Sequence, residues 1–293
     1  MPFDSGRATT ERLSILDRID RELVSVPLVP LEEARFLETH VAYEAHSDQH
    51  RRFIDWFENR IGSVAPTDRP YRVLSVGCGS GLLDVPVARH LASRGAQIDY
   101  VGINPNKAEC AAFERHLAAS GPTSAQLELV RVPFEEFTTE TRFDLVHFVQ
   151  SLYYFDDPGG ALELARRLVA PEGRLILLHA PLESLNQLST RFYDGFLGRP
   201  TLFAEDVAQT LLTWKASCIR ERIEARLDVT PLVEGDKDLS LALSDFIVQV
   251  ESSLLPPELQ SLIRAYLDAI TVKEPHAAPY IPHPVDAFDV RLT

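Results

Sequence analysis

The stretch RVLSVGCGSGLLDVPVARHL, residues 72–91, decides the fold, and IDYVGINPN, residues 98–106, extends it. Val73, Leu74 and Val76 form a short apolar run typical of a buried β-strand. Three glycines at alternating positions follow at once: Gly77, Gly79 and Gly81. A helical pattern begins after them. A nucleotide-type cofactor needs a strand, a glycine turn and a helix in this order, because small residues let the backbone approach the ligand and a helix N-terminus leaves N–H groups unbonded.

The spacing of the glycines distinguishes between cofactors. The dinucleotide fingerprint G-x-G-x-x-G requires glycine at position 82, where this chain has leucine. The pattern G-x-G-x-G, followed by a strand that ends at Asn104, resembles motif I of the class I S-adenosylmethionine-dependent methyltransferases. That resemblance implies S-adenosyl-L-methionine as the cofactor. Three glycines near a strand end can also form an ordinary turn. Even as a cofactor motif, the glycine loop by itself indicates only the superfamily.

Strand and helix patterns alternate from residue 71 onward. We predict strands at 73–76, 98–103, 127–132, 145–148 and 175–178, and helices at 83–93, 107–119 and 160–169. This alternation predicts an α/β fold, a doubly wound Rossmann-like parallel sheet with helices on both faces. Further along, residues 202–214 predict a helix and residues 219–229 an amphipathic strand.

The flanking regions predict mainly helices. Residues 5–63 form an N-terminal helical segment, and residues 239–270 form two helices separated at Pro256 and Pro257, before a last strand at 287–292. The predicted domains are therefore a helical cap at 1–70, a cofactor-binding core at 71–235, a helical substrate-side insertion at 236–284 and a last core strand at 285–293. The pattern alone leaves open whether the insertion covers the cofactor crevice or is a packing appendage.

Length and composition agree with a soluble enzyme. The chain has 293 residues, 45% of them hydrophobic, which is enough for a sizeable core. A net charge of −14 disfavours a nucleic-acid partner, which would need a basic face. The three cysteines are widely spaced and predict neither disulfides nor a zinc site. The charged N-terminus has no apolar signal region and no stretch is long enough to span a membrane, so we expect a cytoplasmic protein.

Two longer segments carry a more specific resemblance. FDLVHFVQSLYYFDDPGGALELARRLVAPEGRLILLHAP, residues 143–181, is similar to the central segment of histamine N-methyltransferase and its relatives, including the run from Gln150 to Tyr154. AHSDQHRRFIDWFENRIG, residues 45–62, is similar to that family's N-terminal substrate helix. The resemblance implies a small-molecule methyltransferase that methylates the nitrogen of an imidazole-like ring or another aromatic or amine substrate.

The resemblance also implies roles for individual residues. The family's glutamine before the Leu-Tyr-Tyr run binds the substrate imidazole, and this role falls on Gln150, with Tyr153 and Tyr154 as pocket walls. Residues just past a parallel strand project into the ligand crevice, which agrees with these roles. The alternative is that the two tyrosines are packing residues. The predicted catalytic set is Gln150, Tyr153, Tyr154 and His283.

The cofactor and substrate sets include departures from the family pattern. Most methyltransferases end the second strand with an acidic residue that binds both ribose hydroxyls, and this chain has Asn104, which lacks the charge. The family's substrate glutamate and C-terminal asparagine fall at Gln49 and near His283, so we expect histamine itself to be a poor substrate. The predicted cofactor contacts are Gly77, Cys78, Gly79, Gly81, Asn104, Pro105, Glu135 and Gln150, and the predicted substrate contacts are Asp48, Gln49, His50, Gln150, Tyr154 and His283.

Alternative interpretations stay open from the sequence. Glu135 could contact adenine or be a solvated loop charge, and Asp84 could be only a helix-start acid. The histidines show no metal-ligand spacing, and we predict no metal. The rival functions are a small-molecule O-methyltransferase that uses His283 or His50 as a base, and a non-catalytic S-adenosylmethionine-binding protein, which Asn104 would favour.

Overall fold

The computed structural model describes residues 5–61, 69–95, 97–122, 125–214 and 216–292. The chain forms two compact units, each built from three segments. The sheet unit comprises His50–Pro181, Leu202–Ile223 and Val285–Thr293, and the helical unit comprises Met1–Gln49, Leu182–Thr201 and Glu224–Pro284. The domain boundaries given above stay a prediction. Residues 62 and 63, the expected end of the N-terminal helical segment, lie outside the described residues.

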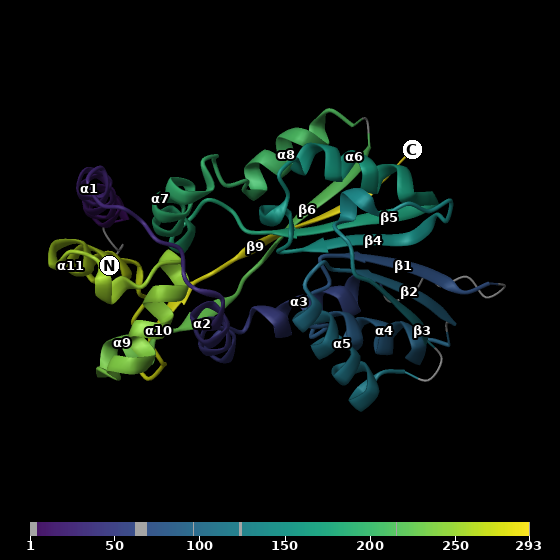
Figure 1. Cartoon of the computed structure of the whole chain (residues 1–293), viewed down its shortest axis with the longest axis horizontal. Helices are drawn as coiled ribbons and strands as arrows, with labels where there is room; N and C mark the ends of the chain where they lie inside the picture. Colours follow the sequence, from purple (N-terminus) through teal and green to yellow (C-terminus); the bar gives the residue numbers. More distant parts are fainter. Residues whose placement is uncertain (1–4, 62–68, 96, 123–124, 215, 293) are drawn as a thin grey trace. The chain divides into compact units, whose positions relative to one another are not determined.

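A seven-stranded sheet in the order β3-β2-β1-β4-β5-β9-β6 forms the sheet unit (Figure 1). Its strands are β1 (Tyr71–Val76), β2 (Ile98–Ile103), β3 (Ala125–Val130), β4 (Phe143–Val149), β5 (Val169–His179), β6 (Ser217–Ile223) and β9 (Val285–Arg291). The first five run parallel, whereas β9 is antiparallel to both β5 and β6. The α/β fold with a Rossmann-like sheet is thus confirmed, and the reversed strand is a feature that periodicity did not predict.

The direction of β9 follows from where the chain enters the sheet. Asp286, near the start of β9, pairs with His179 at the carboxyl end of β5, and Arg291 pairs with Arg174 at the other end. A strand that begins beside the carboxyl end of its neighbour can only run back along it. Hydrophobic spacing carries no information about direction, so the sequence could not distinguish this case.

Alternating side chains of the strands bury two apolar layers, one on each face of the sheet. On one face, Val73, Tyr100 and Leu145 pack with α3 (Gln49–Arg60) and α4 (Asp84–Ser93), and α5 (Lys107–Ser120) lies beside α4. On the other face, strand residues such as Leu74 and Val146 pack with α6 (Pro158–Leu168) and α8 (Ala204–Leu212). Figure 1 shows these helices on opposite sides of the strands. Period-two burial of this kind is what a sheet covered on both faces requires.

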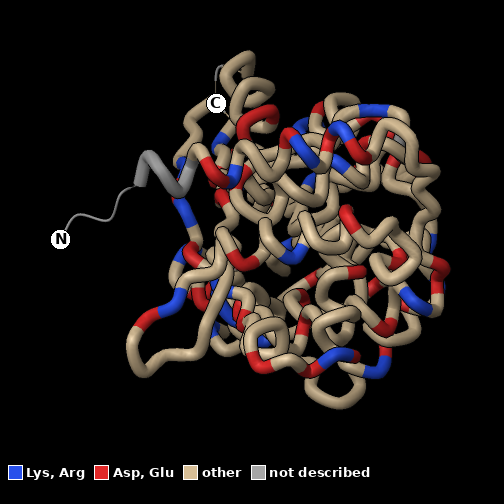
Figure 2. The backbone as a smooth tube through the Cα atoms, turned by 90° about the vertical axis from the view of Figure 1, so that its left-hand side faces the viewer, with Lys and Arg blue, Asp and Glu red and all other residues tan. Residues whose placement is uncertain are grey.

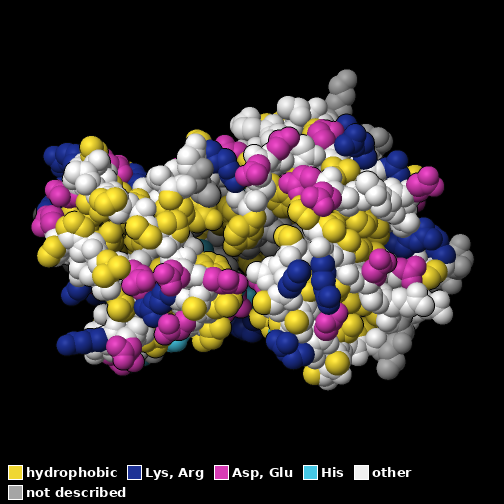
Figure 3. Space-filling model, viewed as in Figure 1, with side chains coloured by type: hydrophobic (Ala, Val, Ile, Leu, Met, Phe, Trp, Pro, Cys, Tyr) yellow, Lys and Arg dark blue, Asp and Glu magenta, His cyan; other side chains and the backbone are white. Residues whose placement is uncertain are grey.

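The helical unit has its own core. It contains α1 (Ser5–Leu23), α2 (Glu33–His46), α7 (Leu185–Leu197), α9 (Thr230–Glu234), α10 (Lys237–Val248) and α11 (Pro257–Ile270), with a two-stranded sheet of β7 (Arg226–Asp228) and β8 (Tyr280–Pro282). Leu243, Leu259 and Tyr266 are fully buried there. Most of the exposed large hydrophobic side chains also belong to this unit, and Figure 3 shows apolar side chains reaching its surface.

Two local expectations were wrong. The strand expected at 219–229 is two strands in different sheets, because β6 ends at Ile223 and β7 starts at Arg226. Between them the Ala225 carbonyl accepts a hydrogen bond from the His283 N–H at 2.8 Å, which draws this segment into the helical unit. The strand β3 begins and ends two residues earlier than expected, and α7 was not predicted.

Charged residues of both signs are interspersed along the backbone in the view of Figure 2. Among the described residues, no helix has the length and apolar character needed to cross a membrane. The absence of a nucleic-acid partner stays a prediction from the net charge.

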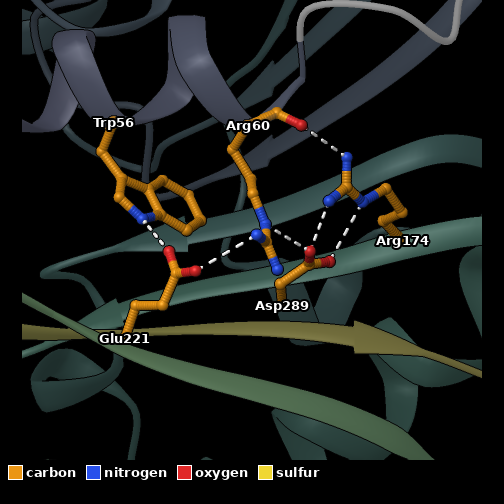
Figure 4. A network of polar contacts seen from close by, with 5 residues as sticks. All are labelled: Trp56, Arg60, Arg174, Glu221 and Asp289. Atoms are coloured by element: carbon orange, nitrogen blue, oxygen red, sulfur yellow. Dashed lines mark hydrogen bonds and ion pairs between the residues drawn. The ribbon is translucent and has the colours of Figure 1, made fainter.

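A buried ion-pair network joins α3 to three strands at the edge of the sheet where the parallel strands begin (Figure 4). Asp289 accepts from Arg174 Nε at 3.0 Å and from Arg60 Nε at 2.7 Å. Glu221 continues the network by accepting from Arg60 at 3.2 Å and from the Trp56 indole at 2.8 Å. Burial raises the pKa of the Asp289 carboxyl, but the hydrogen bonds and charges of Arg174 and Arg60 outweigh it and hold that pKa below its ordinary value.

We expect Asp289→Ala to lower the free energy of unfolding by about 3–5 kcal/mol in urea titrations, because it leaves the buried Arg174 without its partner. A matched control is Glu163→Ala, which removes an exposed ion pair with Arg166 and should cost less than about 1 kcal/mol. Because the pKa of Asp289 is lowered on folding, its contribution is complete above the unfolded-state pKa of about 4 and is lost as the pH falls through the folded-state pKa. Equal losses in the two variants at pH 7 would contradict this role.

Candidate active site

The sheet places two sequence motifs at one point. The chain runs from β1 through β2 to β3 on one side and then returns to β4 on the other side of β1, so the topology reverses between β1 and β4. Ligands of open α/β sheets bind outside the carboxyl ends of the strands at such a reversal. The glycine loop follows β1 and the Gln150–Tyr154 segment follows β4. The Ser151 hydroxyl donates to the Val76 carbonyl at 2.7 Å, which holds the two loops together.

The glycine loop needs its glycines. Gly77, Gly79 and Gly81 have φ angles of 73°, 54° and 76°, in the left-handed region that disfavours other residues. A Cβ at Gly77 would lie 2.5 Å from Ser151 Cβ, and one at Gly81 would lie 2.7 Å from the Phe113 ring. At Gly79, by contrast, a Cβ would meet no atom within 4 Å. The middle glycine therefore borders open space that a side chain would fill, and the loop fits a bound cofactor.

Two backbone hydrogen bonds place this loop against the end of β2. The N–H groups of Gly77 and Cys78 both donate to the Ile103 carbonyl, at 2.9 and 3.2 Å. Asn104 follows directly and is 5% exposed, with Pro105 exposed beyond it. The Asn104 amide oxygen accepts from the Asn106 N–H at 2.9 Å, and its nitrogen donates to Glu109 at 2.6 Å. The side chain predicted to bind the ribose is thus already engaged at both ends.

The residues predicted near the adenine lie one strand further along. Glu135 and Glu136 are exposed in a short 3-10 helix, η1 (Phe134–Glu136), after β3. Phe134 is buried and packs edge-on against Phe148 and Phe155, which fixes this turn on the sheet. The structure brings Glu135 to the same edge of the sheet as the glycine loop.

After β4, a chain of hydrogen bonds orients Gln150. The Ala180 N–H donates to the Tyr153 hydroxyl at 3.0 Å, and that hydroxyl donates to Gln150 Oε1 at 2.7 Å. Since Tyr153 Oη accepts from Ala180, its proton points toward Gln150, and Nε2 of Gln150 is left as the donor end of the amide. Gln150 has a positive φ of 49°. Such a conformation in a non-glycine residue is typical of functional sites.

The neighbours of Gln150 differ in exposure. The Tyr153 ring stacks on the fully buried His179 with 4.1 Å between centroids, and burial raises the pKa of the Tyr153 phenol. Burial lowers the pKa of His179 to about 4, and its Nε2 donates to the Leu202 carbonyl. Tyr154, in contrast, is 70% exposed. Tyr153 is therefore a support for Gln150, whereas Tyr154 presents a ring to the surface of the sheet unit.

Of the six predicted substrate residues, Asp48, Gln49 and His283 belong to the helical unit, and His50, Gln150 and Tyr154 belong to the sheet unit. Gln49 Nε2 lies 3.0 Å from His283 Nδ1 and also donates to the His283 carbonyl at 2.9 Å, while the Tyr43 hydroxyl contacts the same ring nitrogen. Two donors at Nδ1 place the ring proton on Nε2. Burial lowers the pKa of His283 to about 4, so the imidazole is neutral at physiological pH. Asp48 is half-buried and accepts from the Arg226 N–H at 2.7 Å, and this bond attaches it to β7.

Asp84 has more than a helix-start role. It is 3% exposed and accepts from the Tyr100 hydroxyl at 2.5 Å, and that hydroxyl lies 3.0 Å from His147 Nε2. Burial lowers the pKa of His147 against the opposing effect of Asp84, which agrees with a neutral core histidine. Among the residues that the structure describes, no group of three His, Cys, Asp or Glu side chains could hold a metal ion.

Sequence reasoning missed three residues that the structure brings into these clusters: Tyr43, Glu109 and His179. Two of them had a weak signal. Glu109 is three residues after Asn106, which is the spacing of a capping pair, and His179 directly follows a predicted strand. Tyr43 contacts His283 across 240 residues of sequence, and no local pattern could indicate that pairing.

Comparison with known proteins identifies the family. Residues 39–225, more than half of the chain, match the family model described as "Methyltransferase domain". Histamine N-methyltransferase A of Xenopus laevis is 24% identical over 240 residues, which cover 74% of this chain and 80% of that protein. A ubiquinone biosynthesis O-methyltransferase of Acinetobacter baumannii is 29% identical over 140 residues, covering 44% of this chain and 54% of that protein.

Solved structures agree at the level of the fold. The plantazolicin methyltransferase in complex with SAH has a TM-score of 0.52 at 12% identity, covering 98% of this chain and 100% of that chain. The cyclase SpnF has a TM-score of 0.51 at 17% identity, covering 83% and 81%. The chain belongs to the methyltransferase-domain family, and its relatives are class I enzymes that use S-adenosyl-L-methionine. The predicted family and cofactor are confirmed at this level.

We expect Gly79→Val to abolish binding of S-adenosylhomocysteine in calorimetry, because the new side chain would fill the open space of the glycine loop. Gly95→Val is the matched control. Gly95 also has a positive φ, of 84°, and open space around its Cβ position, but it follows α4 at the other edge of the sheet. Both variants carry similar backbone strain, of about 1–2 kcal/mol. If Gly79→Val binds as tightly as Gly95→Val, the loop does not hold the cofactor.

Proposed function

We propose that this protein transfers the methyl group of S-adenosyl-L-methionine to the nitrogen of a small aromatic or amine substrate, in a cytoplasmic setting. The observation that carries the proposal is the position of the Gln150 amide, oriented by Tyr153 at the point where the glycine loop and the β4 loop meet. The relatives support a small-molecule methyltransferase and include enzymes named for nitrogen and for oxygen acceptors. The choice of nitrogen rests on the resemblance and on Gln150.

The reaction demands alignment more than proton chemistry. When bound, S-adenosyl-L-methionine supplies an already activated methyl group on a positively charged sulfur. The protein then has to bring the acceptor atom into line and keep water out. In our proposal, the glycine loop, Asn104, Pro105 and Glu135 hold the cofactor and Gln150 orients the acceptor. A neutral nitrogen needs no strong base, since its proton is lost after the transfer.

The fixed direction of the Gln150 amide restricts what it can bind. Oε1 already accepts from Tyr153 and keeps a second lone pair, while Nε2 can donate. A neutral heteroaromatic ring with one N–H and one bare nitrogen can bind Oε1 through its N–H, which leaves the bare nitrogen as the nucleophile. Tyr153 is then a positioning residue, and Tyr154 is proposed as a wall of the substrate site.

Two of the three proposed substrate contacts of the helical unit, Gln49 and His283, carry no charge, whereas Asp48 is acidic. Gln49 and His283 replace the acidic and amide residues that the histamine-methylating family places there, and His283 is neutral at physiological pH. A substrate ammonium group would therefore lack a charge-assisted partner at these two positions. We propose that Asp48, Gln49, His50 and His283 line the substrate site and that the preferred substrate is not histamine.

O-methylation is the second candidate, because an O-methyltransferase is among the relatives. A phenol acceptor must lose its proton, and the sequence offered His283 or His50 as the base. A histidine with a pKa near 4 is a poor base at pH 7, since it holds the abstracted proton weakly. This argues against His283 in that role and leaves His50 as the candidate base for O-methylation. A non-catalytic binding protein would bind the cofactor and transfer no methyl group in a screen of imidazoles, amines and phenols.

We expect Gln150→Leu to lower kcat/KM for the substrate found in such a screen by about 10- to 100-fold, because a hydrogen-bonding group of the substrate would be left unpaired. The affinity for S-adenosylhomocysteine should stay close to that of the wild type. Gln126→Leu makes the same change at an exposed position of β3 and should leave both quantities unchanged. Full activity in Gln150→Leu would remove Gln150 from the substrate site.

We also expect the wild-type protein to methylate histamine poorly. The measurement is kcat/KM for histamine against that for neutral imidazoles and uncharged heteroaromatic amines of similar size. A preference of about tenfold or more for the uncharged compounds is expected, since a charge-assisted hydrogen bond is lost. Efficient turnover of histamine would contradict the proposed pocket.

A further inference from the structure

The carboxylate of Glu109, a residue of α5, lies at the carboxyl end of β2. Glu109, in the first turn of α5, accepts a hydrogen bond from Asn104 Nδ2 at 2.6 Å. Its carboxylate is therefore beside Asn104, the residue that follows β2, next to the Ile103 carbonyl to which the glycine loop is hydrogen-bonded. Glu109 is half-buried, so the group is held in place while part of it stays accessible.

The local hydrogen bonds explain how this arrangement forms. In a capping box, the glutamate at the third helical position bonds to the N–H of the capping residue. Here Asn106 caps α5 by accepting from the N–H groups of Ala108 and Glu109, at 2.9 and 3.1 Å. The Asn106 N–H, however, donates to Asn104 Oδ1, and Glu109 instead binds the other end of the Asn104 amide. Asn104 thus bridges two groups that would otherwise pair directly.

This bridge decides which atoms can accept a hydrogen bond from a ligand. The Asn104 amide oxygen already accepts from Asn106 and keeps one further lone pair, and it carries no charge. A carboxylate has about four acceptor positions on two oxygens, and Asn104 occupies one of them on Glu109. A pair of neighbouring hydroxyl groups is a double donor, and a carboxylate binds such a pair more strongly than an amide does because its charge strengthens both bonds.

We propose that Glu109, and not Asn104, supplies the charged acceptor for the two ribose hydroxyls of the cofactor, and that Asn104 is a positioning residue that holds the Glu109 carboxylate at the end of β2. This inference rests on the proposed cofactor site and adds a residue to it. The backbone of Asn104 is fixed as well, because its N–H donates to Val130 and its carbonyl accepts from the Cys110 thiol. The carboxylate is therefore presented by a rigid support.

The test compares two ligands by calorimetry: S-adenosylhomocysteine and its analogue without the 2′- and 3′-hydroxyl groups. Glu109→Gln should weaken binding of S-adenosylhomocysteine by about tenfold to a hundredfold and leave binding of the dideoxy analogue unchanged. Glutamine can still accept from Asn104, so the helix cap is preserved. Glu114→Gln is the matched control on the same helix, where Glu114 is exposed and paired with Arg131. It should bind both ligands as the wild type does.

A second pair of variants tests the positioning role of Asn104. Asn104→Asp alone would bring two carboxylates to hydrogen-bond distance, and their repulsion should prevent any gain in affinity. In the Glu109→Gln background the same substitution places a single carboxylate at the strand end, and we expect it to recover most of the lost affinity. If the double variant recovers no affinity, the loss in Glu109→Gln is not the loss of a ribose carboxylate, and the assignment of Glu109 is contradicted.

The outcomes separate this inference from the proposed function. If the wild type binds S-adenosylhomocysteine and Glu109→Gln binds it equally well, the assignment of Glu109 is overturned while the cofactor site stands. An equal loss for both ligands also overturns it, because the effect would not involve the ribose. If the wild type does not bind S-adenosylhomocysteine, the cofactor site fails, and the role of Glu109 fails with it.

Discussion

The Ile103 carbonyl accepts hydrogen bonds from two successive N–H groups, those of Gly77 and Cys78, and the candidate site depends on this contact. It bends the chain sharply after β1 and brings the loop over the end of β2. The bend requires a positive φ at Gly77 and no side chain there, since Ser151 from the β4 loop occupies the adjacent space. One backbone constraint thus brings together the carboxyl ends of β1, β2 and β4. All the proposed cofactor contacts except Glu135 follow directly after these three strands.

Hydrogen bonds within the protein fix the orientation of two amide side chains at the carboxyl ends of the strands. Gln150 is fixed by Tyr153, which is itself fixed by the Ala180 N–H, and Asn104 is fixed between Asn106 and Glu109. An amide whose direction is set by its neighbours can distinguish donors from acceptors in a ligand, whereas a rotating one cannot. Such orientation also reduces the conformational entropy lost on binding. The opposite edge of the sheet is held by ion pairs around Asp289, so stability and binding depend on different residues.

The fold by itself does not define the reaction. A cyclase and a methyltransferase share this fold with the chain at similar TM-scores, and the identities of both are below 20%. The family assignment comes from the sequence match over residues 39–225, whereas the nitrogen acceptor is our proposal and rests on the resemblance and on the Gln150 side chain. The function must therefore be argued from the side chains of the site and from their chemical properties.

The sequence determined the glycine loop, the order of most strands and helices, and the family. The evidence for these features lies in residues 73–81 and 143–181, because residue spacing and local propensity act over a few residues and can be read directly from the sequence. Only the tertiary structure decided that β9 runs antiparallel, that residues 219–229 divide between two sheets, and that Tyr43 meets His283. It also decided that the Asn104 side chain is hydrogen-bonded to Glu109. Strand direction, side-chain pairing and burial depend on contacts between distant segments, and hydrophobic periodicity in one sequence contains no record of them.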